Sequence, residues 1–323
     1  MRSIAMPAPG QIRDAVTADA RIRLGTWDRL RIVAALDTVA LHLTGGHAIF
    51  GFGLPLFLIL AIALGVSKPE APPTRRFLSR RSERILMPWL FWSGVLFVGQ
   101  VWMASRRGQP LFAWLDPRML LYGPRIHLWF LPFIVVAGLV AHRVHRRFPK
   151  AGAPAVLGAV VVAGLCLWIP PQRSFGWPFD QWLFALPAVP LGYALGRGLA
   201  LAGGLDRFRR AATVGWALFC VVGLAVVAIE PGSRGFLLRT AGGLGLLVVG
   251  AWLPARSDGL TRRLAPLMLG VYILHPVVYQ WGLKPLFLEA GVHSVRWLRV
   301  VVTFPVTMLL VAALRQTPLR RFL

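Results

Sequence analysis

Long apolar stretches separated by short polar segments run through almost the whole chain. Each stretch holds roughly 18 or more mainly apolar residues, enough to cross a hydrocarbon core of about 30 Å as a helix. The pattern predicts an all-α, polytopic transmembrane helix bundle of about ten spans, with one membrane domain over residues 27–314. Pro187 and Pro190 predict a kink or a break in the sixth span. The expected spans are 28–46, 48–66, 85–104, 124–142, 153–170, 181–201, 211–230, 235–254, 265–284 and 294–314.

Polar segments flank this domain at residues 1–26 and 315–323, and we expect both to be cytoplasmic tails. The first segment lacks the continuous apolar core of a cleavable signal peptide, so the first span is expected to direct insertion and the N-terminus to be retained. Basic residues gather in alternate connections, which is the positive-inside pattern and predicts that both termini are cytoplasmic. Besides the first tail, the basic groups lie at 68–84, 143–150, 207–210, 256–263 and 315–321.

Composition agrees with a membrane protein, although the charge needs an explanation. The chain has 323 residues, 56% of them hydrophobic, a mean hydropathy of +0.63 and a formal net charge of +24. In a soluble protein this charge would suggest nucleic acid. Here the basic groups are short and lie beside spans, where anionic lipid attracts them, so no nucleic-acid partner is expected.

No sequence motif for a metal or a nucleotide accompanies the spans. The two cysteines, Cys166 and Cys220, lie in apolar runs far apart in sequence and are interpreted as small core residues. Zinc-protease, paired-cysteine, P-loop and dinucleotide signatures are missing from the chain. We therefore expect no metal and no tightly bound cofactor.

The first span holds an unusual number of ionisable residues for a membrane helix. Asp28, Arg29, Arg31, Asp37 and His42 all fall on it, and such groups are costly enough in a membrane to suggest function. Arg31 and His42 are eleven positions apart, which returns them to nearly the same helix face and separates them by about 16 Å along the axis. The spacing predicts a polar stripe, with Arg31 near the cytoplasmic surface and His42 deep in the membrane.

Two roles are open for His42 on this stripe. Its neutral imidazole can hydrogen-bond a neighbouring helix as a structural group, or it can act as a base that takes a hydroxyl proton during acyl transfer. Asp37 lies five positions before it and about 140° around the helix, so a direct carboxylate–imidazole pair is not expected. We expect Asp37 to pair with an arginine of another helix instead.

Four motifs occur in the order typical of one family of membrane enzymes. WDRLRIVAALDTVALH at 27–42 contains D-x-L-R and Arg-x10-His, FLSRRSERILMP at 77–88 contains R-R-x-x-R-x-x-x-P, HLWFL covers 127–131, and GVYILH covers 270–275. Together they resemble membrane acyltransferase family 3 over most of the chain. The chain departs from the family pattern at 57–63, where FLILAIA replaces F-F-x-x-S-G-F, at Met268 in place of a serine, and at Asp37 in place of an aliphatic residue.

The resemblance implies an O-acyltransferase that moves an acyl group, usually acetyl from acetyl-CoA, to a hydroxyl of a cell-envelope saccharide. It implies a multi-pass protein of the cell membrane, the inner membrane of a bacterium, whose partners are acyl-CoA, a glycan or lipid-linked saccharide, and membrane lipids. His42 takes the role of the essential histidine, and Arg31 that of the paired arginine near the donor. A guanidinium suits anionic donor groups, although it suits a carboxylate equally well.

The resemblance also suggests residues around this pair. Arg80, Arg81 and Arg84, at the cytoplasmic start of the third span, would bind CoA phosphates, although topology alone also places arginines there. Trp129 would stack on the donor or sit in an interfacial aromatic belt. His275 precedes Pro276, so it can also simply mark a locally disturbed helix. The secondary candidates are Asp28, Asp37, His127, Tyr272 and His275.

Two functions of other classes remain open from the residues alone. A transporter or flippase would use the polar stripe to bind or conduct, and a non-catalytic partner in envelope assembly would bind another enzyme without turnover. Within the acyltransferase interpretation, His42 either deprotonates the acceptor hydroxyl or carries the acyl group transiently.

Overall fold

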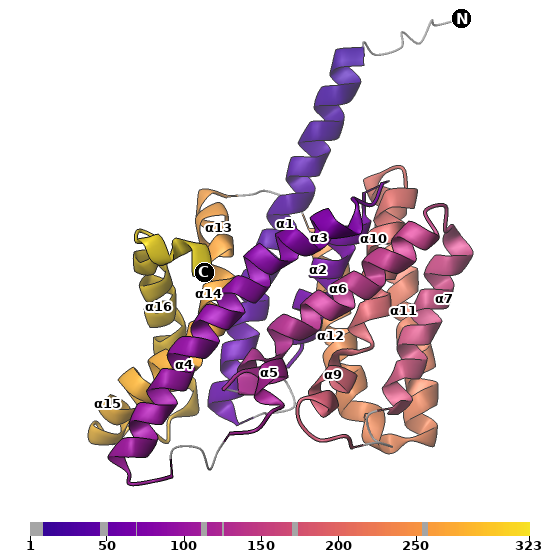
Figure 1. Ribbon diagram of the computed structural model, residues 1–323. Coiled ribbons are helices and arrows are strands. Elements are labelled where there is room, and N and C mark those ends of the chain that lie inside the picture. Colours follow the sequence, from indigo (N-terminus) through magenta and orange to yellow (C-terminus); the bar gives the residue numbers. More distant parts are fainter. Residues whose placement is uncertain are drawn as a thin grey trace, which may run out of the picture.

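The computed structural model describes residues 9–45, 51–68, 70–110, 115–124, 126–169, 174–253 and 258–323. Throughout these ranges the regular structure is helical and no strand occurs, which confirms the all-α prediction. Figure 1 shows the helices packed as a bundle, with the N-terminal part of α1 projecting from one end.

Helices are labelled in chain order, and η marks 3-10 and π segments. The first half forms α1 (Pro9–Thr44), α2 (Gly53–Val66), α3 (Thr74–Arg81), η1 (Ser82–Leu86), α4 (Met87–Arg106), α5 (Met119–Tyr122), η2 (Ile126–Trp129), α6 (Phe130–Arg147), α7 (Ala153–Leu165) and η3 (Cys166–Trp168). The second half forms α9 (Phe179–Ala185), α10 (Ala188–Leu201), α11 (Leu205–Ile229), η4 (Pro231–Ser233), α12 (Arg234–Trp252), α13 (Gly259–Leu264), η5 (Ala265–Leu267), α14 (Met268–Val277), η6 (Val278–Leu283), α15 (Lys284–Glu289), α16 (Arg296–Leu314) and η7 (Pro318–Phe322).

Seven helical stretches of the described chain are long and apolar enough to cross a membrane. They are Thr74–Arg106, His127–Arg147, Phe179–Leu201, Leu205–Ile229, Pro231–Trp252, Gly259–Glu289 and Arg296–Leu314. Two apolar helices are shorter, Gly53–Val66 and Ala153–Trp168, and α1 is more polar than either of them. Each of the ten predicted spans coincides with one of these stretches, so the multi-pass architecture is supported, while the count of ten and the orientation stay predictions.

Several boundaries differ from those expected. The sixth span is broken between Ala185 and Ala188, as its prolines predicted. The helix of the third predicted span begins at Thr74 rather than at residue 85, because the basic segment before the span is helical too. In the predicted N-terminal tail, α1 already begins at Pro9, and residues 1–8 lie outside the described residues.

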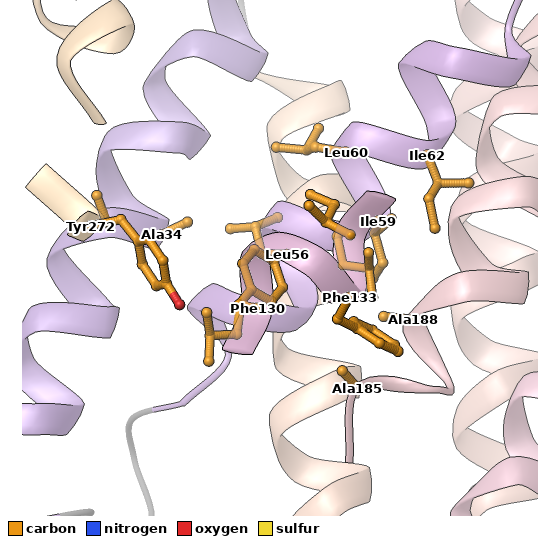
Figure 2. Close-up of a cluster of buried hydrophobic side chains, with 14 of the residues drawn as sticks. Ala34, Leu56, Ile59, Leu60, Ile62, Phe130, Phe133, Ala185, Ala188 and Tyr272 are labelled. Atoms are coloured by element: carbon orange, nitrogen blue, oxygen red, sulfur yellow. The ribbon is translucent and has the colours of Figure 1, made fainter. Parts of the chain in front are cut away.

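Helix α2 forms the centre of the bundle because its sequence, GLPLFLILAIALGV, is apolar on every face. A helix of this kind must be surrounded by other helices. It packs against α1, α6, α10 and α12. Figure 2 shows part of the resulting core, with Ile59 and Ile62 of α2, Phe133 of α6 and Ala188 of α10.

Two glycines let α10 approach α2 closely. A Cβ at Gly192 would lie 2.8 Å from Ile62 Cβ, and one at Gly196 would lie 2.5 Å from the backbone oxygen of Ala63. Small residues four positions apart are the usual solution for tight contact between membrane helices. This contact joins α2 to the half of the bundle formed by α7 and α9 to α12.

Basic segments meet at one end of the bundle. Arg146 Nη1 donates to Thr74 Oγ1 at 2.8 Å, and Arg29 pairs with Asp258 at 2.9 Å. Hydrogen bonds from the backbone and side chain of Thr261, together with the Arg29 guanidinium, lower the pKa of the Asp258 carboxyl to about 2. Figure 1 shows α3, α13 and the α6–α7 connection at the end from which α1 projects. The shared face is what the positive-inside pattern requires.

The predicted C-terminal tail folds back onto the bundle. Trp92 Nε1 of α4 donates to the backbone oxygen of Phe322 at 2.8 Å, and the Phe322 ring stacks on Phe91 at 4.1 Å. Leu323 reaches α14, where a Cβ at Gly270 would lie 3.3 Å from its Cδ2. The segment therefore links α4 to α14.

Candidate active site

The polar stripe of α1 lies against α14. Arg31, about one-third exposed, pairs with Asp28 one turn earlier, at 2.9 Å between Nη1 and Oδ1. Arg31 borders a cavity that Tyr272 of α14 also lines, and His42 contacts His275 of the same helix. The helix is continuous between Arg31 and His42, so both residues face α14 at different depths.

The cavity has a volume of about 980 Å³ and lies at the end of the bundle that carries the basic segments. This is at the upper end of the roughly 300–1,000 Å³ typical of small-molecule sites. Among the described lining residues, Glu70 is the sole acidic one. The basic lining residues are Arg31, Lys68, Arg76, Arg80, Arg81 and Arg84. Such a lining suits a polyanion.

These arginines differ in how they are held. Arg81 donates from Nη2 to the backbone oxygen of Ala61 at 3.1 Å, and its guanidinium lies over the Phe77 ring at 5.4 Å. Arg80 and Arg84 are exposed and make no ion pair with any described residue. Arg81 is thus a fixed part of the wall, whereas Arg80 and Arg84 keep their hydrogen-bond donors available.

A change of helical winding positions the last of these side chains. Residues Ser82–Leu86 form a π segment between α3 and α4. Pro88 accounts for it, because proline has no N–H to bond the Arg84 carbonyl in the regular α register. Short π segments are frequent at functional sites. Here the segment carries Arg84 and Ile85 into the cavity wall.

Three histidines from distant parts of the sequence meet next to this cavity. His42 Nδ1 of α1 lies 3.3 Å from His275 Nε2 of α14, and the two ring centroids are 5.1 Å apart. The ring of His127, from η2, lies 6.0 Å from that of His275. His127 and His275 are buried, whereas His42 keeps an exposed surface. The motifs at 27–42, 127–131 and 270–275 thus converge.

Backbone carbonyls hold each ring. His42 Nδ1 lies 2.8 Å from the oxygen of Thr38, and His127 Nε2 lies 3.1 Å from that of Ile273. His275 Nδ1 lies 2.9 Å from the oxygen of Tyr272. In a regular helix that oxygen would accept from residue 276, but Pro276 has no N–H to give. The proline thus frees the carbonyl that His275 binds.

Tyr272 belongs to both the cavity and the histidine cluster. Its side chain lines the cavity, and its hydroxyl donates to the backbone oxygen of His127. Its ring lies 5.7 Å from that of Phe130 and 6.4 Å from that of His275. Figure 2 shows Tyr272 and Phe130 in the buried cluster, and Phe130 also lines the cavity. The cationic cavity and the imidazole cluster therefore adjoin at one buried aromatic residue.

The sequence was compared with the models of known protein families. The family model of an acyltransferase domain, that of membrane acyltransferase family 3, matches residues 24–316 and so covers the whole cavity and cluster. The chain belongs to acyltransferase family 3. No curated protein and no solved structure matches it. The protein is a multi-pass membrane acyltransferase.

In this acyltransferase the residues of the HLWFL motif do not all face the cavity. His127 turns toward α14, and Phe130 and Leu131 line the cavity. Trp129 is buried against the rings of Phe130 and Phe133, and it is not among the lining residues. Its proposed stacking on the donor stays a prediction, for which the structure offers packing contacts only.

The two carboxylates of the first span have structural partners. Asp28 pairs with Arg31. Asp37 is buried, and its Oδ2 accepts from the backbone N–H groups of Gly51 at 2.9 Å and Gly53 at 2.7 Å. Arg239 of α12, which packs against Gly51, interacts with its charge. Asp37 therefore fixes the start of α2 through backbone amides. The expected pair with an arginine of another helix stays a prediction, since Asp37 forms no ion pair with another described residue.

Two basic residues of the cavity were missed from the sequence. Arg76 precedes Arg80 by four positions in the same helix and Lys68 precedes that helix, and both line the cavity. The four-residue spacing, which puts Arg76 and Arg80 on one face, could have identified Arg76. For Lys68 the sequence holds no comparable signal.

Proposed function

We propose that this acyltransferase moves an acyl group, acetyl in the simplest case, from acyl-CoA to a hydroxyl of a cell-envelope saccharide. One observation carries the proposal: a cavity with six basic lining residues adjoins, at Tyr272, a histidine cluster that contains the His42 of the Arg-x10-His motif. CoA is a polyanion, and arginine is the preferred protein ligand for phosphate groups.

In the proposed orientation the chain spans the membrane ten times with both termini in the cytoplasm, in the inner membrane of a bacterium. The cavity then opens on the cytoplasmic side, where acyl-CoA is made. This is supported by the basic segments that border the cavity, since such segments remain cytoplasmic. Arg31 lies at the cavity and His42 eleven residues further along α1, so the acceptor reaches His42 from deeper in the membrane.

The reaction is a direct transfer with His42 as general base. His42 takes the proton of the acceptor hydroxyl, and the hydroxyl oxygen attacks the thioester carbonyl. The carbon–sulfur bond breaks as the ester forms, and the leaving CoA sulfur receives the proton from the imidazolium. The guanidinium groups of the cavity hold the phosphates of CoA, which positions the thioester for attack. No metal or tightly bound cofactor takes part in this scheme.

The test is CoA release from acetyl-CoA by protein reconstituted in lipid vesicles with envelope glycan. Loss of a general base reduces the rate by about 10²- to 10⁴-fold, so His42→Ala should lose most of the activity. His293→Ala, a substitution outside the cluster, is the matched control and should retain it. Equal release from wild type and a correctly inserted His42→Ala protein would exclude the catalytic role of His42.

A covalent acyl-histidine route gives a different result. It would leave radiolabelled acyl group on the protein when acetyl-CoA is supplied without acceptor. Direct transfer predicts no labelled protein under these conditions. A transporter would move substrate without CoA release, and an assembly partner would co-purify with another enzyme and release none.

A further inference from the structure

The carbonyls around His275 determine which of its nitrogens carries the proton. Its Nδ1 faces two backbone oxygens, those of Tyr272 at 2.9 Å and Val271 at 3.1 Å. A carbonyl oxygen only accepts, so Nδ1 must be the donor. In the neutral ring the proton is then on Nδ1, and Nε2 presents a lone pair. That lone pair points at His42.

His42 is held in the same tautomer. Its Nδ1 faces the oxygen of Thr38 at 2.8 Å, so this nitrogen also carries a proton. His42 Nδ1 also lies 3.3 Å from His275 Nε2, so its N–H is shared between the Thr38 oxygen and that nitrogen. Nε2 of His42 has no hydrogen-bond partner among the described residues. It is left as an unprotonated nitrogen on the ring that keeps an exposed surface.

The opposite arrangement is unfavourable. For His275 to donate to His42, its proton would have to move to Nε2, which would leave two carbonyl oxygens facing a lone pair. His275 is fully buried, so no water can replace the lost hydrogen bonds. Pro276 strengthens the preference for the Nδ1–H form of His275, because it leaves the Tyr272 carbonyl without its usual helical N–H donor.

We propose that His275 is a positioning residue for acyl transfer, an acceptor for the Nδ1–H of His42 that directs His42 Nε2 to the acceptor hydroxyl. This inference rests on the proposed function. When Nε2 takes the hydroxyl proton, His42 becomes an imidazolium, and its hydrogen bond to His275 becomes charge-assisted and stronger. A fixed, buried acceptor stabilises that charge without having to reorganise. The proton returns from Nε2 to the CoA sulfur, and Nδ1 keeps its proton throughout.

Two substitutions separate this role from a purely structural one. The side-chain amide of glutamine reaches the position of His Nε2, whereas that of asparagine reaches the position of Nδ1. His275→Gln can therefore still accept from His42, while His275→Asn keeps only the link to the Tyr272 carbonyl. A positioning role predicts that glutamine is the better replacement. If His275 serves only to hydrogen-bond the Tyr272 carbonyl, asparagine should be the better replacement.

We expect kcat of His275→Asn to fall about tenfold to a hundredfold, the usual worth of a hydrogen bond to a charged group. The KM for acetyl-CoA should be unchanged, since His275 is not among the residues that line the cavity. His275→Gln should recover most of the rate. A kcat for His275→Asn that equals or exceeds that of His275→Gln overturns the proposal.

A second measurement on the wild-type protein does not depend on turnover. Solid-state NMR of ¹⁵N-histidine-labelled protein in lipid, with His42 identified by the signals lost in His42→Ala, reports which ring nitrogen is protonated. We expect His42 and His275 both to be protonated on Nδ1, with a correlation between His42 Nδ1 and His275 Nε2. A His42 protonated on Nε2 overturns the inference. If both rings of the wild type are protonated on Nδ1 but the protein releases no CoA, the proposed function fails, and so does a catalytic use of the pair.

Discussion

Replacing Arg84 by glutamine is expected to weaken CoA binding without disturbing the fold. The side chain projects from the π segment into the cavity, is exposed, and makes no ion pair with another described residue. A hydrogen bond to a charged group contributes about 1.5–3 kcal/mol, and a solvated contact belongs at the lower end. A loss of about 1.4 kcal/mol is tenfold in affinity. The Kd for CoA should therefore rise roughly tenfold, with a similar rise for Arg80→Gln.

The double variant should lose less than the product of the single effects. Arg80 and Arg84 lie four positions apart, so removing one charge also relieves repulsion at the other. Isothermal titration of detergent-solubilised protein with CoA measures both effects, and dephospho-CoA shows whether the 3′-phosphate is involved. Arg107→Gln, at the far end of α4 and outside the cavity, is the matched control. An unchanged Kd in both single variants, with normal thermal stability, would refute the assignment of the cavity to CoA.

Three further predictions concern the fold. Gly196→Ala should lower thermal stability by about 1–3 kcal/mol, because its Cβ would lie 2.5 Å from a backbone oxygen of α2; Gly198→Ala, with open space around it, should not. Asp37→Ala should cost about 1–3 kcal/mol for each of the two buried amides it leaves unpaired, whereas Asp37→Asn keeps an acceptor and should cost less in the same melting assay. Asp258→Asn should destabilise the protein near neutral pH. Because the folded-state pKa is about 2 against the usual 3.8, the difference from wild type should shrink as pH falls from about 4 toward 2, and a constant difference would contradict the capping role.

Local sequence was enough to predict the helices. The length of each apolar run is a property of one segment, and so is the break that Pro187 and Pro190 impose on the sixth span. The stripe from Arg31 to His42 also follows from one helix, because helical geometry alone relates positions eleven residues apart. For the same reason, the arginines at 80, 81 and 84 could be placed at one end of one span.

Contacts between segments could not be read in the same way. The hydrogen-bond distance between His42 and His275 joins residues 233 positions apart, and only the packing of α1 on α14 brings them together. Trp129 shows the converse: its neighbours Phe130 and Leu131 line the cavity, but its own side chain packs into the core. The docking of Phe322 on Trp92 likewise depends on the position of α4. The family resemblance identified the histidines, whereas the contacts between them could be known only from the three-dimensional structure.

The placement of Tyr272 bears on how the membrane stays sealed. A water-filled cavity on one side and a histidine with an exposed surface beyond it would, if joined, let protons leak down the electrochemical gradient. Tyr272 lines the cavity, and its ring is buried against Phe130, lies 6.4 Å from that of His275 and is tied through its hydroxyl to the chain at His127. A two-carbon acyl group needs far less room to pass such a ring than the nucleotide that carries it. If the cavity binds acyl-CoA as proposed, Tyr272 stands where the thioester enters the histidine cluster, and it is suited to limit the passage of water and of the CoA nucleotide at that point.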